Sequence, residues 1–237
     1  MQLLNKNNFI IFWKTIRYNL KIIFAGRFVW FLLASFAFYL FFSILMIYQG
    51  QMLSEGMVYN ILLFPGILLV FYPSVFGIQN DEDSRILEIL FGIPNYRYKV
   101  WLGRVVMIFV QGFLILILYG YVSSYLLYTV RPLEMAFQLM FPIGFMGGMA
   151  FMFSTLIKNG NGTAVIMILT GVALLILGEA IERSQWNIFL NPMELPNNFN
   201  PFIWEGIVTR NRIFLGVGMI VFLLYGLFNL QNREKFV

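Results

Sequence analysis

The sequence predicts an all-α integral membrane protein with six transmembrane helices, and three observations lead to this prediction. Of the 237 residues, 60% are hydrophobic and 11% are charged, whereas a soluble domain has about 25% charged residues. Six apolar stretches are long enough to cross a hydrocarbon core of about 30 Å as helices. Lys and Arg are unevenly distributed between the two sets of loops that join these stretches. We expect a single transmembrane domain, residues 1–237.

The six spans can be placed from the apolar stretches in order along the chain. We place them at residues 28–48, 57–79, 100–129, 135–157, 162–181 and 213–230. No small-residue cleavage site follows the first, so we expect it to stay in the mature protein. If the N-terminus is cytoplasmic, 12 Lys and Arg residues lie inside and 4 outside, which predicts that both termini are cytoplasmic. The net charge of +5 then reflects topology, and we expect no nucleic-acid partner.

Residues 9–26, ahead of the first span, have the pattern of an amphipathic helix. Its three basic residues fall within about 60° of arc, and an apolar stripe covers a broad opposite side. This pattern is typical of a helix that lies in the membrane interface. Two interpretations stay open, an elbow helix that leads into the first span and an ordinary juxtamembrane anchor. The residues expected to anchor the chain at the interface are Trp13, Lys14, Arg17 and Lys21.

The segment 182–212, between the fifth and sixth spans, is long, apolar and rich in proline. Pro192, Pro196 and Pro201 preclude one continuous helix through it. Its apolar residues, which include two Trp, argue against a solvated loop. We therefore expect a re-entrant outer segment, made of short helices that dip into the outer leaflet and pack against the protein.

A charged segment, residues 81–99, lies between the second and third spans. As a helix, residues 81–93 would gather four aliphatic side chains within about 100° of arc, with charged residues on the far side. Acidic residues at the start suit the positive end of the helix dipole, and Pro94 ends the helix. We expect a short cytoplasmic helix parallel to the membrane. From the residues alone, a docking element and a plain connecting helix both remain open.

The same segment resembles the signature of type-2 ABC-transporter permeases. That signature, Glu-x-Gly-Thr-Leu-Glu-Leu-Leu-Leu-x-x-Pro-x-x-Arg followed by Leu-Leu-Gly-Lys, lies between the second and third of six spans. Residues 87–91 cover its Leu-Glu-Leu-Leu-Leu core, and residues 102–104 cover Leu-Gly-Lys with Arg in place of Lys. Arg85 and Ile86 depart from its Gly and Thr. The number of spans, the amphipathic N-terminal helix and the long outer segment also agree with this family.

The resemblance implies a permease subunit of an ATP-driven exporter in the inner membrane of a bacterium, with no catalytic residue of its own. In that family the charged segment is a coupling helix that sits in a cleft of a separate ATPase subunit. The implied partners are that ATPase in two copies, a second permease chain and the lipid bilayer. The sequence lacks a G-x-x-x-x-G-K-[S/T] phosphate loop, so ATP and Mg belong to the ATPase and no cofactor is expected here. The residues implied to contact the ATPase are Asp83, Arg85, Glu88, Pro94 and Arg97.

Two features of the fourth span bear on packing and metals. Gly144 and Gly148 form a pair of small residues that allows close helix approach, either within one chain or at a dimer interface. Thioethers bind Cu(I), but the sequence has no Cys or His to join its methionines. We therefore interpret the methionines as apolar packing and expect no metal site. They are Met140, Met146, Met149 and Met152.

Few ionisable residues lie in or near the spans. Arg104 is near the inner end of its span, where we expect it to snorkel to the interface. Glu179 is near an outer end, and we expect it to pair with Arg183 four residues later. We interpret both as structural, which disfavours an ion-coupled pump.

Two other functions remain as alternatives to a permease. A non-transporting scaffold or immunity protein would use the charged helix to recruit a cytoplasmic partner. A membrane-integral enzyme acting on lipid would need a clustered acid–base set, and Glu179, Glu182 and Glu194 have no such spacing. The absence of His and Cys also removes histidine acid–base chemistry and thiol nucleophiles. The sequence identifies neither the cargo nor, beyond the family expectation of export, the direction of transport.

Overall fold

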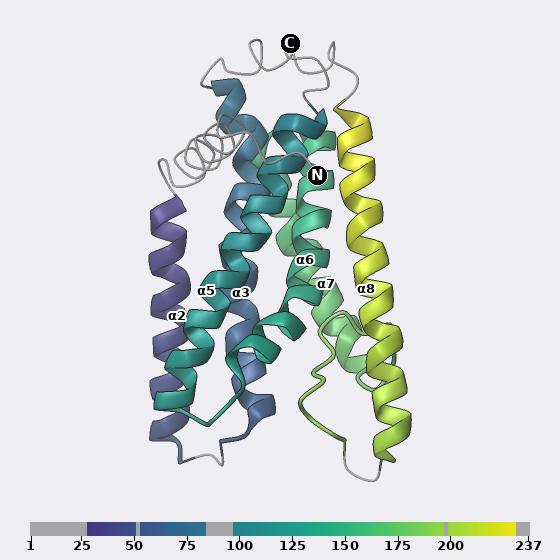
Figure 1. Ribbon diagram of the computed structural model, residues 1–237. Coiled ribbons are helices and arrows are strands. Elements are labelled where there is room, and N and C mark those ends of the chain that lie inside the picture. The colour runs from purple at the N-terminus through teal and green to yellow at the C-terminus, as the bar shows by residue number, and fades with distance from the viewer. Residues whose placement is uncertain (1–27, 51–52, 84–96, 197–198, 231–237) are drawn as a thin grey trace, which may run out of the picture.

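The computed structural model describes residues 28–50, 53–83, 97–196 and 199–230, which form helices and connecting turns without a strand. All six long helices are long and apolar enough to cross a membrane, and they run alternately up and down in Figure 1. The prediction of an all-α, multi-pass membrane protein is confirmed. The helices are α2 (Phe28–Tyr48), α3 (Glu55–Asp83), α5 (Gly103–Leu126), α6 (Pro132–Ile157), α7 (Gly160–Ala180) and α8 (Pro201–Asn229), and a π-helical turn, η1 (Arg97–Leu102), precedes α5.

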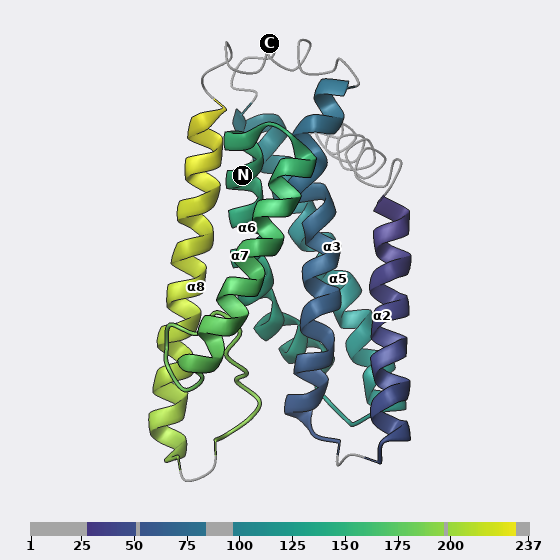
Figure 2. The same ribbon diagram turned by 180° about the vertical axis from the view of Figure 1, so that it is seen from behind.

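Helix α6 is the centre of the bundle. It packs against α3, α5, α7 and α8, and like α3 it is mostly buried, whereas α2, α7 and α8 are mostly exposed. Figures 1 and 2 show α2 and α8 at opposite edges of the molecule in both views. The exposed side chains of these outer helices are largely apolar, as expected for surfaces that face lipid rather than water.

The main apolar core lies where α3, α5 and α6 meet. It includes Leu62 and Leu69 of α3, Leu116 of α5, and Leu139 and Ile143 of α6, all of which are buried. At the edge of this core, α2 is tied on by polar contacts. Such interhelical bonds contribute on average about 0.6 kcal/mol each in a membrane. They are Ser35 Oγ to Pro65 O at 3.1 Å, Ser35 to Tyr119 at 3.2 Å and Tyr39 to Ser123 at 2.9 Å.

The turn from α6 to α7 follows from three residues at the junction. Lys158 ends α6 with a positive φ of 62°, and Asn159 then caps α7 by accepting a hydrogen bond from Gly162 N at 3.0 Å. Asn is among the preferred N-cap residues because its side chain satisfies a free backbone N–H. Gln79 of α3 accepts from Gly160 N at 2.5 Å, so the turn is also fixed to α3.

The last helix begins earlier than the sequence predicts. α8 starts at Pro201 rather than near residue 213, with Asn200 as its N-cap, so residues 201–212 belong to the same helix as the last span and not to separate short helices. Proline is well tolerated at the first position of a helix because its missing N–H would be unpaired there in any case. We call the remainder, residues 181–200, the α7–α8 segment. Its described residues form turns rather than the short helices that we expected.

Candidate functional site

The charged segment between α3 and η1 is described only at its two ends. Asp83 is the last residue of α3 and its side chain is exposed, and Arg97 is the first residue of η1. Both ends lie at the upper end of the bundle in Figure 1. The other residues predicted to contact an ATPase, Arg85, Glu88 and Pro94, lie outside the described residues, as do the predicted interface anchors Trp13, Lys14, Arg17 and Lys21.

Two large polar side chains at η1 are buried in the bundle. Trp101 is 2% exposed and Arg104 is 4% exposed. The guanidinium carbon of Arg104 lies 4.7 Å from the centre of the Trp101 ring, which is a cation–π contact. The expectation that Arg104 snorkels out to the interface is therefore wrong. Its position three residues after Trp101 puts both side chains on one face of the helix, and that face is turned inward.

This face continues along α5 as a row of polar groups at the seam with α3. Gln111 lies ten residues after Trp101 and shares its face. Among the described residues, neither Trp101 Nε1 nor the amide of Gln111 has a hydrogen-bond partner. Both side chains line small hollows beside Pro73 of α3. A buried amide without a partner destabilises the folded state by about 1–3 kcal/mol, so this seam is incompletely satisfied in the arrangement described.

Gly144 and Gly148 face α8 of the same chain. A Cβ atom at Gly144 would lie 2.6 Å from Met219 Sδ, and one at Gly148 would lie 3.2 Å from the Met219 carbonyl oxygen. The two glycines therefore allow α6 and α8 to approach closely. On the same helix, Met146 and Met149 are buried in an apolar cluster. No group of three His, Cys, Asp or Glu that would hold a metal ion occurs among the described residues.

At the opposite, lower end of the bundle, Arg212 forms a buried polar cluster between α3, α6, α8 and the α7–α8 segment. It is 7% exposed. No carboxylate among the described residues pairs with it, and neutral oxygens accept its N–H groups instead. We call this group the Arg212 cluster. Its hydrogen bonds are Nε to Gln138 Oε1 at 2.9 Å, Nη1 to Asn211 Oδ1 at 2.8 Å, and Nη2 to Leu190 O at 3.3 Å and Tyr59 OH at 3.4 Å.

Three asparagines fold the α7–α8 segment onto the bundle. Asn211 Nδ2 donates to Asn187 O at 2.7 Å and to Gln185 O at 2.9 Å. Asn191 Nδ2 donates to Gly56 O of α3 at 2.9 Å, while its Oδ1 accepts from Met193 N at 3.0 Å. The side chain of Asn187 likewise accepts from Phe189 N at 2.9 Å. These bonds satisfy backbone groups that have no strand or helix partner, which is why an irregular segment is fixed here.

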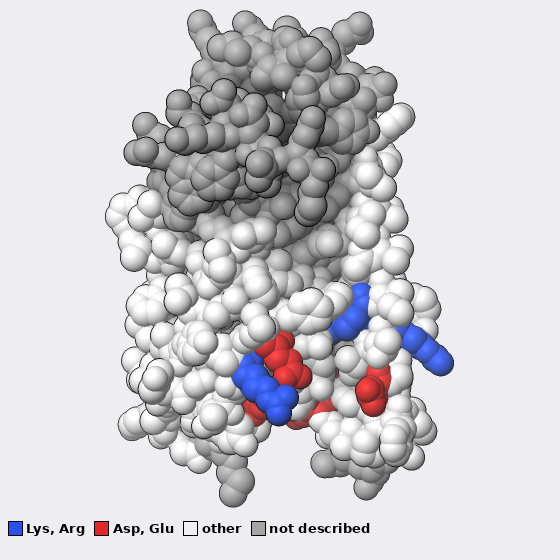
Figure 3. Space-filling view, viewed as in Figure 1, with Lys and Arg blue, Asp and Glu red and all other residues white. Residues whose placement is uncertain are grey.

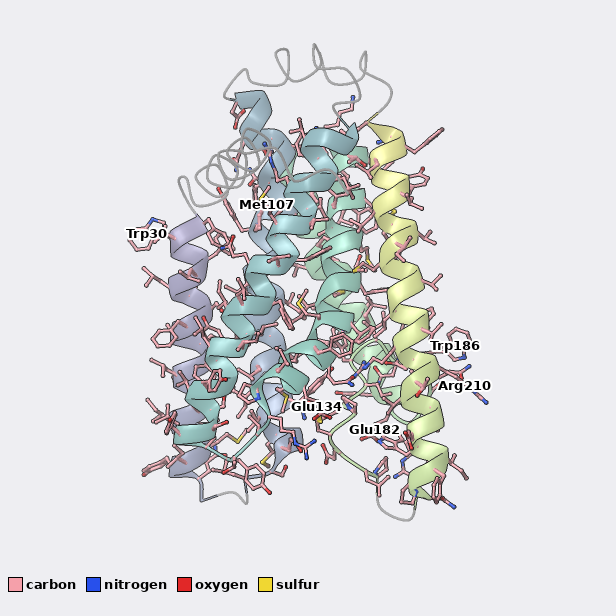
Figure 4. The ribbon with its side chains drawn as sticks, viewed as in Figure 1. Trp30, Met107, Glu134, Glu182, Trp186 and Arg210 are labelled. Carbon is pink, nitrogen blue, oxygen red and sulfur yellow. The ribbon has the colours of Figure 1, made fainter. Side chains whose placement is uncertain are left out.

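A polar pocket of about 360 Å³ lies against the α7–α8 segment. It is lined by nine residues of that segment, by Asn60 of α3 and by Trp204 of α8. Figure 3 shows that the charged side chains of the described residues on this face of the molecule gather in its lower half. Figure 4 shows Glu134 and Glu182 at this end, far from Trp30 and Met107. The pocket is much larger than the two small hollows at the seam between α3 and α5.

The expected ion pair between Glu179 and Arg183 is not formed. Both residues are described, and the guanidinium carbon of Arg183 lies instead 5.7 Å from the centre of the Phe199 ring. An ion pair does occur on the exposed surface between Arg131 and Glu134, at 3.2 Å. Like most exposed pairs, it contributes little to stability.

The sequence alone does not indicate the Arg212 cluster. Three prolines and several polar residues precede Arg212, and this pattern is typical of an outer loop. Its signal was nevertheless present: Asn200 followed by Pro201 is a helix-start pattern, and a helix that begins there carries Arg212 into an apolar span. An ionisable residue inside a span would then have been a functional candidate.

No family model, curated protein or solved structure matches this chain.

Proposed function

We propose that the chain is the membrane-spanning permease subunit of a type-2 ABC transporter. In this proposal it forms a translocation path as a dimer with a second permease chain and is driven by a separate ATPase subunit. The observation that carries the proposal is the sequence of residues 83–104, which resembles the family signature and lies between the second and third of six apolar helices.

The two described ends of that segment connect it directly to helices of the bundle, which supports the proposal. Asp83 ends α3, and Arg97 begins η1, which leads directly into α5. α3 is mostly buried and packs against α2, α5, α6 and α7. A partner that bound the residues between Asp83 and Arg97 would therefore move two helices of the bundle together. Such a partner needs no contact with the rest of the chain to change its packing.

The seam between α3 and α5 supports it as well. Trp101 and Gln111 leave polar atoms without partners among the described residues, beside Pro73. A π-helical turn such as η1 is often found at functional sites. Unsatisfied buried groups favour any second arrangement in which they find partners. The proposed motion would follow this seam.

The proposal assigns ATP and Mg to the partner, because the sequence has no phosphate-binding loop. It assigns no catalytic residue and no cofactor to this chain. Both termini and residues 84–96 would be cytoplasmic, and the α7–α8 segment would be on the outer side of a bacterial inner membrane.

Co-purification from native membranes tests the proposal. The double variant Glu88→Ala/Arg97→Ala is compared with the wild type and with Glu205→Ala/Arg210→Ala, which removes the same charges from exposed positions on α8. We expect an ATP-binding subunit with the wild type and the control, and at least about tenfold less of it with Glu88→Ala/Arg97→Ala, since one order of magnitude corresponds to about 1.4 kcal/mol of contact energy.

Reconstitution of the recovered complex in liposomes completes the test. ATP hydrolysis by the ATPase should rise when the permease is present, and the Glu88→Ala/Arg97→Ala variant should abolish that rise. An intact protein that retains no ATPase in mild detergent would contradict the proposal and favour the scaffold alternative. Equal recovery by both double variants would show that the segment does not dock the ATPase.

A further inference from the structure

The pocket beside the α7–α8 segment holds charges of both signs that the protein itself leaves unused. Glu182, Arg183 and Glu194 all line it. No hydrogen bond or ion pair among the described residues engages the carboxylate of Glu182 or the N–H groups of Arg183, which contacts only the ring of Phe199. Glu194 has a single long hydrogen bond, from Asn191 to its Oε2 at 3.4 Å. Two carboxylates and one guanidinium are thus available to a ligand.

A neutral donor completes this set. Trp204 also lines the pocket, but it is only 7% exposed and its Nε1 is fully buried, so the residue contributes a wall and no donor. Asn60 accepts from Asn191 at 3.3 Å through its Oδ1, and its own N–H groups are not used by any described residue.

The wall of the pocket is fixed before any ligand binds. The amides of Asn187 and Asn191 line it but are occupied by hydrogen bonds within the protein, and Leu190 O accepts from buried Arg212 at 3.3 Å. These groups hold the shape of the pocket and do not compete for a ligand. A preformed wall reduces the ordering that binding would otherwise require.

We propose that this pocket binds a zwitterion, a small molecule or head group that carries an ammonium group and a phosphate or carboxylate group. Glu182 and Glu194 would hold the ammonium group, and Arg183 and Asn60 Nδ2 would hold the anionic group. Charge-assisted hydrogen bonds of this kind are roughly twice as strong as neutral ones. The proposal stands whether or not the chain is a permease.

Other ligand classes fit the pocket less well. The three charged side chains sum to −1, so a simple anion would be repelled by two carboxylates. A neutral polyol would leave all three charges uncompensated. A divalent metal would need more oxygen ligands than these carboxylates supply, and Arg183 would oppose it. The volume of about 360 Å³ lies within the range of about 300–1,000 Å³ that is typical of small-molecule sites.

Binding of two probes to the purified full-length chain in maltoside detergent or nanodiscs tests the proposal. Free phosphoethanolamine is titrated by calorimetry, and retention of phosphatidylethanolamine against phosphatidylglycerol is measured by native mass spectrometry. Binding of phosphoethanolamine itself identifies a soluble ligand, whereas retention of the diacyl lipid alone identifies a membrane lipid as the source.

Charge-changing variants give the site assignment. Glu182→Gln/Glu194→Gln should weaken binding of the bound probe at least about tenfold, and Arg183→Gln should do the same. Glycerol phosphate, which lacks the ammonium group, should distinguish the two variants. Its binding should fall with Arg183→Gln and rise with Glu182→Gln/Glu194→Gln. Glu205→Gln and Arg210→Gln, at exposed positions on α8, are the matched controls.

Several results would overturn the proposal. The proposal is overturned if the wild type binds neither probe. It is also overturned if the pocket variants bind as well as the Glu205→Gln and Arg210→Gln controls. Because Glu182, Arg183 and Glu194 are exposed, their variants should elute and melt like the wild type, so a loss of binding would not reflect unfolding. Equal loss of glycerol phosphate binding in all the pocket variants would contradict the assignment of ammonium to the two glutamates.

Discussion

Arg212 is a cation inside an apolar bundle without a carboxylate partner among the described residues. Its charge is distributed over four neutral oxygens from α3, α6, α8 and the α7–α8 segment. An arginine suits this role because its planar fork presents five donors in fixed directions. The residue therefore acts as a junction, and each oxygen it binds loses a partner when it is removed.

Replacement of Arg212 by Ala should destabilise the protein strongly. We expect a loss of at least about 1–3 kcal/mol, the cost of leaving a buried polar group without its hydrogen-bond partner. The stability of Arg212→Lys should lie between those of the wild type and Arg212→Ala, since a lysine cannot reach all four acceptors. Unfolding of the purified protein, followed by loss of monomer in size-exclusion chromatography after heating, measures the effect.

Arg210→Ala is the control for this prediction. Arg210 is exposed two residues earlier on the same helix, and its removal should change stability by no more than about 0.5 kcal/mol. Equal melting of the two alanine variants would show that the Arg212 cluster does not hold the bundle together.

Replacement of Gln111 by an apolar residue should not destabilise the protein, in contrast to replacement of Arg212. Its amide is buried without a partner among the described residues, so Gln111→Leu removes a penalty and keeps a similar volume. We expect an unchanged or higher melting temperature. If the α3–α5 seam moves during transport, the same variant should lower ATP-driven activity in liposomes, because it removes the amide that would find a partner in the second arrangement. A clear loss of stability would show that Gln111 is already satisfied.

Five of the six helices could be predicted from the sequence because long apolar runs leave little choice of structure. α2, α6 and α7 begin and end within about three residues of their predicted bounds, the usual precision for helix ends. Pro65 and Pro73 did not break α3, because neighbouring helices in a membrane satisfy the backbone groups that proline frees. Ser35, which donates to Pro65 O at 3.1 Å, fixes α2 to this part of α3.

The start of α8 could not be predicted in the same way. Asn211 and Arg212 look like loop residues in sequence, and only the acceptors at Gln138, Tyr59 and Leu190 make them tolerable inside a span. Those acceptors are 22 to 153 residues away in the sequence. For the same reason the pocket at the α7–α8 segment was not foreseen, since its residues come from α3, α8 and the segment between α7 and α8.

Contact between α6 and α8 gives a prediction at the scale of these elements. A valine at Gly144 would bring Cβ to 2.6 Å from Met219 Sδ, so Gly144→Val should destabilise the protein by about 1–3 kcal/mol through overpacking. Gly216 of α8 has no atom within 4 Å of its Cβ position, and Gly216→Val should be nearly neutral. Thermal unfolding of both variants tests this. A stable Gly144→Val protein would imply that the flexible Met219 side chain moves aside at little cost.

The whole molecule has two chemically different ends. The upper end carries the described ends of the charged segment, Asp83 at the end of α3 and Arg97 at the start of η1 (Figure 1). The lower end carries Glu182, which lines the pocket (Figure 4). In the proposed orientation, which follows from the excess of Lys and Arg, the upper end is cytoplasmic. The proposed energy input and the proposed zwitterion site would then lie on opposite sides of the membrane.

Cysteine labelling in intact cells tests this sidedness directly, because the chain has no native Cys. Leu195→Cys and Asn161→Cys are exposed positions in the α7–α8 segment and at the start of α7. A membrane-impermeant maleimide should label Leu195→Cys in intact cells and Asn161→Cys only after permeabilisation. The reverse pattern would invert the orientation, and labelling of both from one side would contradict the six-span arrangement.

The Arg212 cluster also has a consequence for the order in which the protein is made. Insertion of an arginine near the middle of an isolated helix is unfavourable by about 2.5–3.5 kcal/mol, and α8 is the last of the described helices in the chain. Tyr59, Gln138 and Leu190 all precede Arg212, so each of its acceptors outside α8 has left the ribosome before α8 emerges. The helices and the α7–α8 segment that precede α8 thus provide the acceptors for this arginine, and α8 completes the bundle last.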